Sequence, residues 1–206
     1  GYLPCQFMSP LDNQRTDRYG GNLTRRMTFG IECIQAMRAA VGDDYPLFIR
    51  LGAWEDRPGG ATLDDNVKYS VALEKAGVDC IDVSVAVSAR RRYFAEPGPK
   101  QPMGTFVPLA AAIKERVKVP VVAVGRINAP EVAESVLTEG KADLIAIGRQ
   151  LIADPFWPKK VMEGRASQIV LCDSCNSKCR DHQRGKVFGC RVNPRAGREW
   201  EIPPPE

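Results

Sequence analysis

Four cysteines near the C-terminus have the spacing of a metal or cluster site. Within "LCDSCNSKCRDHQRGKVFGC", residues 171–190, the pattern C-x2-C-x3-C-x10-C is formed by Cys172, Cys175, Cys179 and Cys190. The residues between them are mostly polar, so burial in an apolar core does not explain the thiols. Thiolates are soft, strongly donating ligands, and four of them complete a 4Fe-4S cluster. We call residues 171–190 the cysteine segment.

Zinc is the alternative ligand for these thiols. A zinc site usually has two C-x2-C pairs or histidines at ligand spacing, whereas the only histidine of this chain is His182. The spacing alone favours a cluster and leaves zinc open. The remaining cysteines, Cys5, Cys33 and Cys80, lie in apolar sequence and are predicted to be ordinary packing residues.

Two apolar segments end with the same dipeptide. "VVAVGRI" and "LIAIGRQ" contain Gly125-Arg126 and Gly148-Arg149, which we call the Gly-Arg ends. In a (β/α)8 barrel the loops after the last two strands commonly bind a phosphate, because glycine admits the anion to backbone N–H groups and arginine supplies a planar fork. One Gly-Arg is more simply a strand end with a surface arginine, but the repetition favours a phosphate site. Arg50 lies inside the apolar segment "FIRLG", so we expect an anionic or acceptor-rich partner for it.

Alternating apolar and amphipathic segments must position these residues. We predict strands at 46–52, 80–85, 120–125 and 143–148, with helices at 27–42, 62–77, 106–117, 129–140 and 155–165. Thr62 is the predicted N-cap of one helix and Gly77 its stop. Strands joined by helices pair in parallel through right-handed crossovers, and we expect them to be buried on both faces.

The strand count predicts half of a barrel. If the Gly-Arg ends follow the seventh and eighth strands, the chain holds strands 5–8 of a (β/α)8 TIM barrel. The start "GYLPCQF", without a methionine, reads as though the chain were cut just past a fourth strand. We therefore expect a piece of a longer polypeptide, or a chain that a partner completes. We predict a barrel half at 1–165 and a cluster-binding extension at 166–206.

Composition excludes several other classes. The 206 residues are 44% hydrophobic and 26% charged with a net charge of +4, which is typical of a globular chain and not of a nucleic-acid binder. No stretch is long and apolar enough to span a bilayer. The N-terminal residues have no charged-then-apolar signal pattern either, so we expect a cytoplasmic protein. In a reducing compartment a cysteine cluster is more often a metal site than a disulfide framework, and the odd total of seven cysteines also argues against complete pairing.

The N-terminal residues "GYLPCQFMSPLDNQRTDRYGGNLTRRMTF" resemble the segment after the fourth barrel strand in the old yellow enzyme family of FMN-dependent oxidoreductases. The resemblance continues through the Gly-Arg ends. The cysteine segment, followed by "RVNPRA", is similar to the iron–sulfur segment of the 2,4-dienoyl-CoA reductase and 2-enoate reductase branch. The resemblance implies a 4Fe-4S cluster on the four cysteines and an FMN site formed with Arg50, Gly125, Arg126, Gly148 and Arg149.

The resemblance also assigns a role to Tyr2. In that family the tyrosine of Gly-Tyr-Leu gives a proton to the substrate carbon opposite the face that receives hydride from the flavin. A phenol suits this role because its ordinary pKa, near 10, keeps it protonated at neutral pH. Without the family pattern, Tyr2 is more simply a packed tyrosine with a hydrogen-bonded hydroxyl.

One loop departs from the family pattern. The dienoyl-CoA reductase branch often has a histidine after the sixth strand, but "VSVAVSARRRYFAEPG" has none, and Ser88 or a neighbour takes its place. The substrate therefore need not be a dienoyl-CoA. The run Arg90–Arg92 that follows is either a solvated loop or a site for a carboxylate or phosphate.

The resulting prediction is an NAD(P)H-dependent ene-reductase that reduces an activated C=C bond of an enoate, dienoyl-CoA or enone. By resemblance, electrons come from NAD(P)H, through an FAD in C-terminal flavin and nicotinamide domains, to the cluster and FMN. An assembly of identical chains is left open. The alternatives are an amine dehydrogenase of the trimethylamine type, which has x2 rather than x3 before the third cysteine, and a zinc-stapled barrel fragment without catalysis.

Overall fold

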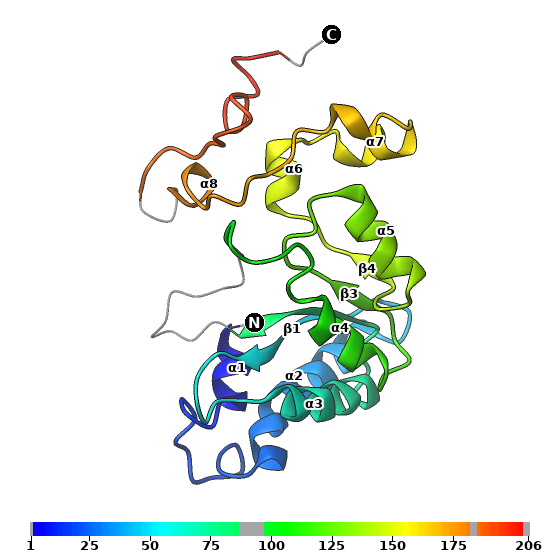
Figure 1. The fold of residues 1–206 in the computed structure, drawn as a ribbon. Coiled ribbons are helices and arrows are strands. Elements are labelled where there is room, and N and C mark those ends of the chain that lie inside the picture. Colours follow the sequence, from blue (N-terminus) through cyan, green and yellow to red (C-terminus); the bar gives the residue numbers. More distant parts are fainter. Residues whose placement is uncertain (1, 87–96, 182–184, 204–206) are drawn as a thin grey trace. The chain divides into compact units, whose positions relative to one another are not determined.

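The chain alternates helices with parallel strands (Figure 1). The structure is a computed structural model that describes residues 2–86, 97–181 and 185–203. In chain order its elements are α1 (Tyr2–Met8), α2 (Leu23–Val41), β1 (Phe48–Glu55), α3 (Leu63–Lys75), β2 (Cys80–Ala86), α4 (Val107–Lys114), β3 (Val121–Ala123), α5 (Pro130–Thr138), β4 (Leu144–Ile145), α6 (Arg149–Ala153), α7 (Trp157–Met162), the 3-10 helix η1 (Ala166–Gln168) and α8 (Lys178–Asp181).

The four strands form one parallel sheet in the order β1-β2-β3-β4. Consecutive strands lie side by side and helices connect them, which is the arrangement of βα units in a barrel. β3 and β4 stop before the Gly-Arg ends, so neither dipeptide lies in its predicted strand: Gly125-Arg126 lies in a connection, and Gly148-Arg149 begins α6. At the first of them the reason is local, because Gly125 and Arg126 have φ of 120° and 58°, which no strand residue adopts.

Helix α3 shows why the local sequence folds as predicted. The Thr62 hydroxyl accepts a hydrogen bond from the Asp65 N–H, and the Asp65 carboxylate accepts one from the Thr62 N–H. This reciprocal pair is a capping box, so the predicted N-cap is confirmed. The helix ends at Lys75, two residues before Gly77, whose φ of 106° takes the chain out of the helical path.

Helices cover one face of the sheet, where α3 and α4 contact the strands. Figure 1 shows α2, α3 and α4 on the same side of it. The strand residues beneath the helices are at most 3% exposed: Leu51, Ile81, Val83, Val121 and Ala123. On the other face the register places Arg50, Asp82, Val122 and Leu144 in one row across the sheet.

The prediction of strands buried on both faces is wrong for the described residues. Leu144 at one end of that row is 48% exposed, and Phe48, two residues before Arg50 in β1, is 63% exposed. Four strands curve through only part of a barrel, so in the described ranges no further strand closes over these side chains.

The same polar contact occurs twice at the N-terminal edge of the sheet. An aspartate just before a strand accepts a hydrogen bond from a backbone N–H at the start of the neighbouring, earlier strand. It also pairs with a basic residue from the last turn of the helix that leads into that earlier strand. The partners are Leu47 and Arg38 for Asp79, and Val121 and Lys114 for Asp143. We call these contacts the aspartate latches. They fix the start of each strand at the face that serves stability in barrels of this kind.

The described residues pack into two compact units, which we consider separately. The first holds the whole sheet and comprises residues 1–95, 106–124 and 136–146. The second comprises 96–105, 125–135 and 147–206, so it contains both Gly-Arg ends together with the cysteine segment. The predicted boundary at residues 165 and 166, between the barrel half and the cluster-binding extension, stays a prediction.

The two units have different interiors. In the first, large aliphatic side chains are fully buried, for example Leu73, Ile81 and Ile113. In the second, the buried apolar side chains of the described residues are mostly small, and a set of polar side chains is buried with them: Asn128, Gln150, Asp154 and Ser174, each at most 4% exposed. No helix in the described part of the chain is both long enough and apolar enough to cross a bilayer.

Candidate functional site

Tyr2 is the first residue of α1 and its side chain is 83% exposed. The phenol is therefore open to solvent rather than packed, which does not fit the simple packing role. Gly1, the residue before it, lies outside the described residues. Whether Tyr2 donates a proton to a substrate stays a prediction.

Arg50 has the acceptor-rich partners that the sequence predicts. Its Nη1 donates to the Asp82 carboxylate and its Nη2 donates to the Ser84 hydroxyl at 3.1 Å. The Arg50 side chain is 48% exposed, so the ion pair forms at the open face of the sheet and not in the core. Asp82, which sequence reasoning missed, fixes the direction of this guanidinium through the register that places the two residues opposite each other.

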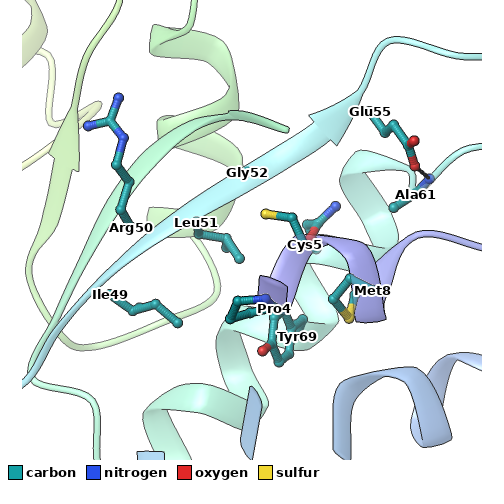
Figure 2. A pocket seen from close by; sticks show the side chains of 11 residues that line it. Pro4, Cys5, Met8, Ile49, Arg50, Leu51, Gly52, Glu55, Ala61 and Tyr69 are labelled. Carbon is teal, nitrogen blue, oxygen red and sulfur yellow. Dashed lines mark hydrogen bonds between the residues drawn. The ribbon is translucent and has the colours of Figure 1, made fainter. Parts of the chain in front are cut away.

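A small pocket lies next to Arg50 in the first unit, between α1, β1 and α3 (Figure 2). Figure 2 shows Leu51 directed toward Cys5 of α1, while the Arg50 side chain extends away from that helix. The free volume of about 10 Å³ is close to what one water molecule needs. The pocket therefore has no room for a flavin, and a cofactor at Arg50 has to lie on the other side of β1.

Tyr69 supplies the pocket with an unusual polar group. Its side chain is 1% exposed, and within the described residues its hydroxyl has no hydrogen-bond partner. Burial raises the pKa of this phenol well above its ordinary value, and the thiols of Cys5 and Cys33 raise it further. Tyr69 is therefore a neutral group at physiological pH. Gly30 in α2 admits it, because a Cβ at residue 30 would stand 1.6 Å from the Tyr69 Oη.

The first Gly-Arg end is tied to the cysteine segment. Arg126 donates through Nε to the Ser174 hydroxyl at 3.1 Å and through Nη1 to the Gln101 carbonyl. Ser174 is 1% exposed and lies between the first two cysteines. The guanidinium is thus held by the protein itself on two sides.

The second Gly-Arg end makes the equivalent contacts. Arg149 donates through Nη1 to the Pro97 carbonyl at 2.9 Å and to the side-chain oxygen of Asn176. Asn176 lies between the second and third cysteines. Gly148 borders open space, because a Cβ built there would meet no atom within 4 Å. A ligand that approaches this backbone would therefore meet no protein side chain at that point.

The four predicted ligands all lie in the second unit and are partly buried. Burial raises the pKa of the Cys179 thiol; Arg149 lowers it, and charge on the other three thiols raises it. Burial likewise raises the pKa of Cys172. The thiols are thus close enough to influence one another electrostatically. Even so, no three or more His, Cys, Asp or Glu side chains of the described residues form a group arranged to hold a metal ion.

Two buried side chains that sequence reasoning missed hold the backbone of Cys172. The Gln150 amide accepts from the Cys172 N–H at 2.8 Å and donates to the Val170 carbonyl at 2.9 Å. The Asn128 amide donates to the Cys172 carbonyl at 2.8 Å. Gln150 directly follows the second Gly-Arg end and Asn128 lies two residues after the first, so a polar residue within two positions of each repeated dipeptide was the available signal.

The sequence predicts that five flavin-site residues converge, and the contacts described above concern two of them. Arg126 and Arg149 meet the same segment within the second unit. Arg50 belongs to the first unit, so its position relative to them stays a prediction. Ser88, the run Arg90–Arg92 and His182 lie outside the described residues.

Fold and site together define the class: a part of a (β/α)8 TIM barrel with a polar, arginine-bearing site after its last two strands. A family model described as "NADH:flavin oxidoreductase / NADH oxidase family" matches residues 1–168. The chain therefore belongs to this family of oxidoreductases, and the resemblance to the old yellow enzyme group is confirmed.

Three characterised relatives match almost the whole chain. It is 45% identical over 203 residues to a metal reductase of Desulforamulus reducens, which covers 98% of this chain and 30% of the relative. It is 46% identical over 204 residues to an NADH oxidase of Thermoanaerobacter brockii, with 97% and 31% covered. A cinnamate reductase of Clostridium sporogenes is 32% identical over 216 residues, with 98% and 32% covered. The chain thus spans about a third of the length of these relatives.

Solved structures agree on the fold. A complex of 2-naphthoyl-CoA reductase with 2-naphthoyl-CoA matches with a TM-score of 0.90 and 37% identity, covering 98% of this chain and 31% of that one. Histamine dehydrogenase of Rhizobium sp. 4-9 matches with a TM-score of 0.85 and 30% identity, covering 96% and 28%.

Proposed function

We propose that this chain forms the FMN-phosphate and iron–sulfur portion of an NAD(P)H-dependent ene-reductase that reduces an activated C=C bond. The observation that carries the proposal is the combination of a family match over residues 1–168 with four cysteines gathered directly after it. Relatives named for cinnamate and 2-naphthoyl-CoA support a substrate whose C=C bond is conjugated with a carboxylate or thioester.

The residues around the Gly-Arg ends fit a bound FMN. The open space at Gly148 leaves its backbone accessible, and Gly125 has a φ of 120° that a residue with a side chain rarely adopts. Arg126 and Arg149 bring two fixed positive charges to the same unit. Arg50, half exposed beside Asp82, would serve the flavin from β1. When bound, FMN supplies hydride chemistry, and the protein supplies orientation and charge.

The donor set of the cysteine segment fits a 4Fe-4S cluster. Four partly buried thiols lie in the second unit, which is the ligand number and type that a cubane requires. The chain's own role is to hold these thiols against rearrangement, which the bonds from Gln150 and Asn128 to Cys172 do for the first ligand. The described side chains do not form a preassembled metal group, so this proposal requires the thiols to move into place around the fixed backbone of Cys172 when the cluster is inserted.

Tyr2 is the proposed proton donor. Its hydroxyl is exposed at the start of α1, so it is free to meet a substrate rather than committed to a core contact. The phenol would hold its proton at Oη and release it to the substrate carbon. NAD(P)H as electron source, an FAD domain, the remaining barrel strands and a cytoplasmic location are further parts of the proposal.

This function is tested by measuring the iron, sulfide and FMN contents of variants of the intact protein. Cys175→Ala removes one cluster ligand, so it should lose most of the iron and sulfide and keep FMN. Gly148→Val places a branched side chain in the open space where the proposed FMN would approach the backbone, so it should lose FMN and keep the iron. Cys33→Ala, a cysteine outside the cysteine segment, serves as the control and should keep both. Zinc in stoichiometric amount without sulfide, after anaerobic purification, would point to the zinc-stapled barrel fragment instead.

An amine dehydrogenase is the second candidate, because the histamine dehydrogenase structure matches with a TM-score of 0.85. The x3 spacing before the third cysteine favours the ene-reductase, since the trimethylamine type has x2 there. Anaerobic mixing separates the two functions. An ene-reductase is bleached by NAD(P)H and re-oxidised by an enoate, whereas an amine dehydrogenase is bleached by an amine.

A further inference from the structure

The two arginines of the Gly-Arg ends each donate a hydrogen bond to one turn of the cysteine segment. Arg126 donates to Ser174, the middle of the turn from Cys172 to Cys175. Arg149 donates to Asn176, which begins the turn from Cys175 to Cys179. The two contacts therefore lie between successive predicted cluster ligands.

Ser174 and Asn176, the two residues that accept these hydrogen bonds, have strained backbones. Ser174 and Asn176 have φ of 58° and 53°, and Arg126 itself has φ of 58°. Among the described residues these three are the non-glycine positions with left-handed backbone. Such a conformation costs on the order of 1 kcal/mol or more and persists only where the surroundings enforce it. The side-chain bonds from the arginines are part of that enforcement.

Ser174 accepts a second hydrogen bond, from a buried amide. Its hydroxyl lies 3.3 Å from the Asn128 amide nitrogen, which also donates to the Cys172 carbonyl. Ser174 is 1% exposed, so water does not replace these bonds if they are lost. A buried hydroxyl with two donors pointing at it is fixed in direction.

Each arginine is also anchored by a backbone carbonyl of the protein. Arg126 binds the Gln101 carbonyl and Arg149 binds the Pro97 carbonyl. Each guanidinium therefore bridges the 97–101 segment and one cysteine turn. A residue that served a phosphate alone would not need these four protein contacts.

We propose that Arg126 and Arg149 are positioning residues for the iron–sulfur cluster, which fix the turns at Ser174 and Asn176 between successive ligands and so slow the loss of iron from the assembled cluster. This inference rests on the proposed function, since it requires a cluster on the cysteine segment. In this proposal the arginines have two roles: they bind the FMN phosphate, and they position the backbone next to the cluster ligands.

Substitutions in the turns, and not in the arginines, isolate this role. Asn176→Gly accepts the left-handed backbone without strain and removes the acceptor for Arg149. Asn176→Asp keeps an acceptor at the same place. Ser174→Gly and Ser174→Ala form the corresponding pair for Arg126, one relieving the backbone strain and one retaining it. Arg198→Gln, which removes an exposed ion pair with Glu201 in the same unit, is the matched control.

The intact protein with its cluster is mixed anaerobically with a ferrous chelator, and the rate of iron release is measured together with FMN content and the EPR spectrum of the reduced cluster. Removing an outer-shell partner typically weakens metal binding about 10–100-fold. We expect Asn176→Gly and Ser174→Gly to release iron at least about 10-fold faster with FMN content unchanged. Asn176→Asp and Arg198→Gln should stay near the parent rate.

Two results would overturn the proposal. Parent-like release from Asn176→Gly and both Ser174 variants would mean that the arginine contacts do not hold the cluster. Equally fast release from Asn176→Gly and Asn176→Asp would mean that the acceptor for Arg149 is not the relevant feature. A parent protein without iron and sulfide fails the proposed function instead, so the two failures are distinguishable.

Discussion

The two compact units both bury polar side chains, but they differ in the apolar side chains around which they pack. The first surrounds a parallel sheet with fully buried aliphatic side chains and closes its N-terminal edge with the two aspartate latches. The second has small apolar side chains and relies on buried amides and hydroxyls that bond to the backbone. Apolar burial is non-directional and tolerant, whereas a buried polar contact is favourable only while every partner is present.

This difference matches the proposed division of chemistry. The first unit carries Tyr2, whose role requires an exposed hydroxyl and a stable helix behind it. The second unit carries the thiols, which must keep one geometry through each change of charge. Directional bonds suit the second task, because they specify where each backbone segment lies. Four substitutions test the comparison.

The largest expected effect concerns the chemistry of the first unit. Tyr2→Phe removes a single hydroxyl from an exposed ring, so fold and FMN content should be unchanged. General acid catalysis typically contributes about 10²–10⁴-fold, which is the expected loss in the rate of flavin re-oxidation by the alkene. Reduction of the flavin by NAD(P)H does not use that proton and should keep its rate. Rapid mixing measures each half-reaction, and an equal fall in both would indicate structural damage.

The second-largest effect is expected from a substitution that creates a cavity in the core of the first unit. Leu73 in α3 is 0% exposed, so Leu73→Ala should lower the stability of that unit by about 2–5 kcal/mol. Native-state hydrogen exchange should show faster exchange in β1 and β2, while peptides covering the cysteine segment keep their protection. Equal acceleration in both units would mean that they unfold as one, and the comparison would lose its energetic meaning.

A smaller loss is expected from the polar contacts of the second unit. Gln150→Met has similar length but leaves the Cys172 N–H and the Val170 carbonyl without their partner. An unsatisfied buried group costs about 1–3 kcal/mol, so exchange in residues 166–176 should accelerate accordingly. β1 and β2 should be unaffected. Unchanged exchange would show that water replaces the amide and that the contact is not decisive.

The smallest effect concerns an aspartate latch and acid. Burial opposes ionisation of Asp143, but bonds from Lys114 and the Val121 N–H outweigh it and hold the pKa of this carboxyl below its ordinary value. A lowered pKa in the fold means stability that is present above about pH 4 and lost as pH falls through the lowered value. Asp143→Asn should therefore lower stability at pH 6 by less than about 1 kcal/mol and by less still near pH 3.

Urea unfolding of the first unit measures this latch, in a Cys175→Ala background so that acid loss of iron does not contribute. Lys114→Gln removes the cation but keeps the backbone bond, and it should reproduce only part of the pH dependence. An identical pH profile for the parent and Asp143→Asn would exclude the latch as an acid-sensitive contact.

Sequence reasoning succeeded where structure depends on periodicity and local caps. The spacing of apolar residues predicted β1, β2 and α3, and Thr62 was identified from its own sequence neighbours. It failed for the contacts of the second unit, because Gln150 and Cys172 lie 22 residues apart and nothing in either position specifies the other. The Gly-Arg ends were found by repetition, but their bonds to Ser174 and Asn176 depend on tertiary placement.

The close approach of Gly30 and Tyr69 restricts the order in which this sequence can change. A Cβ at residue 30 would stand 1.6 Å from the phenolic oxygen and 2.8 Å from the Cζ that carries it. Deleting the oxygen alone therefore leaves too little room, and residue 69 must first become a shorter side chain. Only then is a larger residue at position 30 tolerated. The two positions form an epistatic pair, in which the viable path of substitution begins in α3 and only afterwards reaches α2.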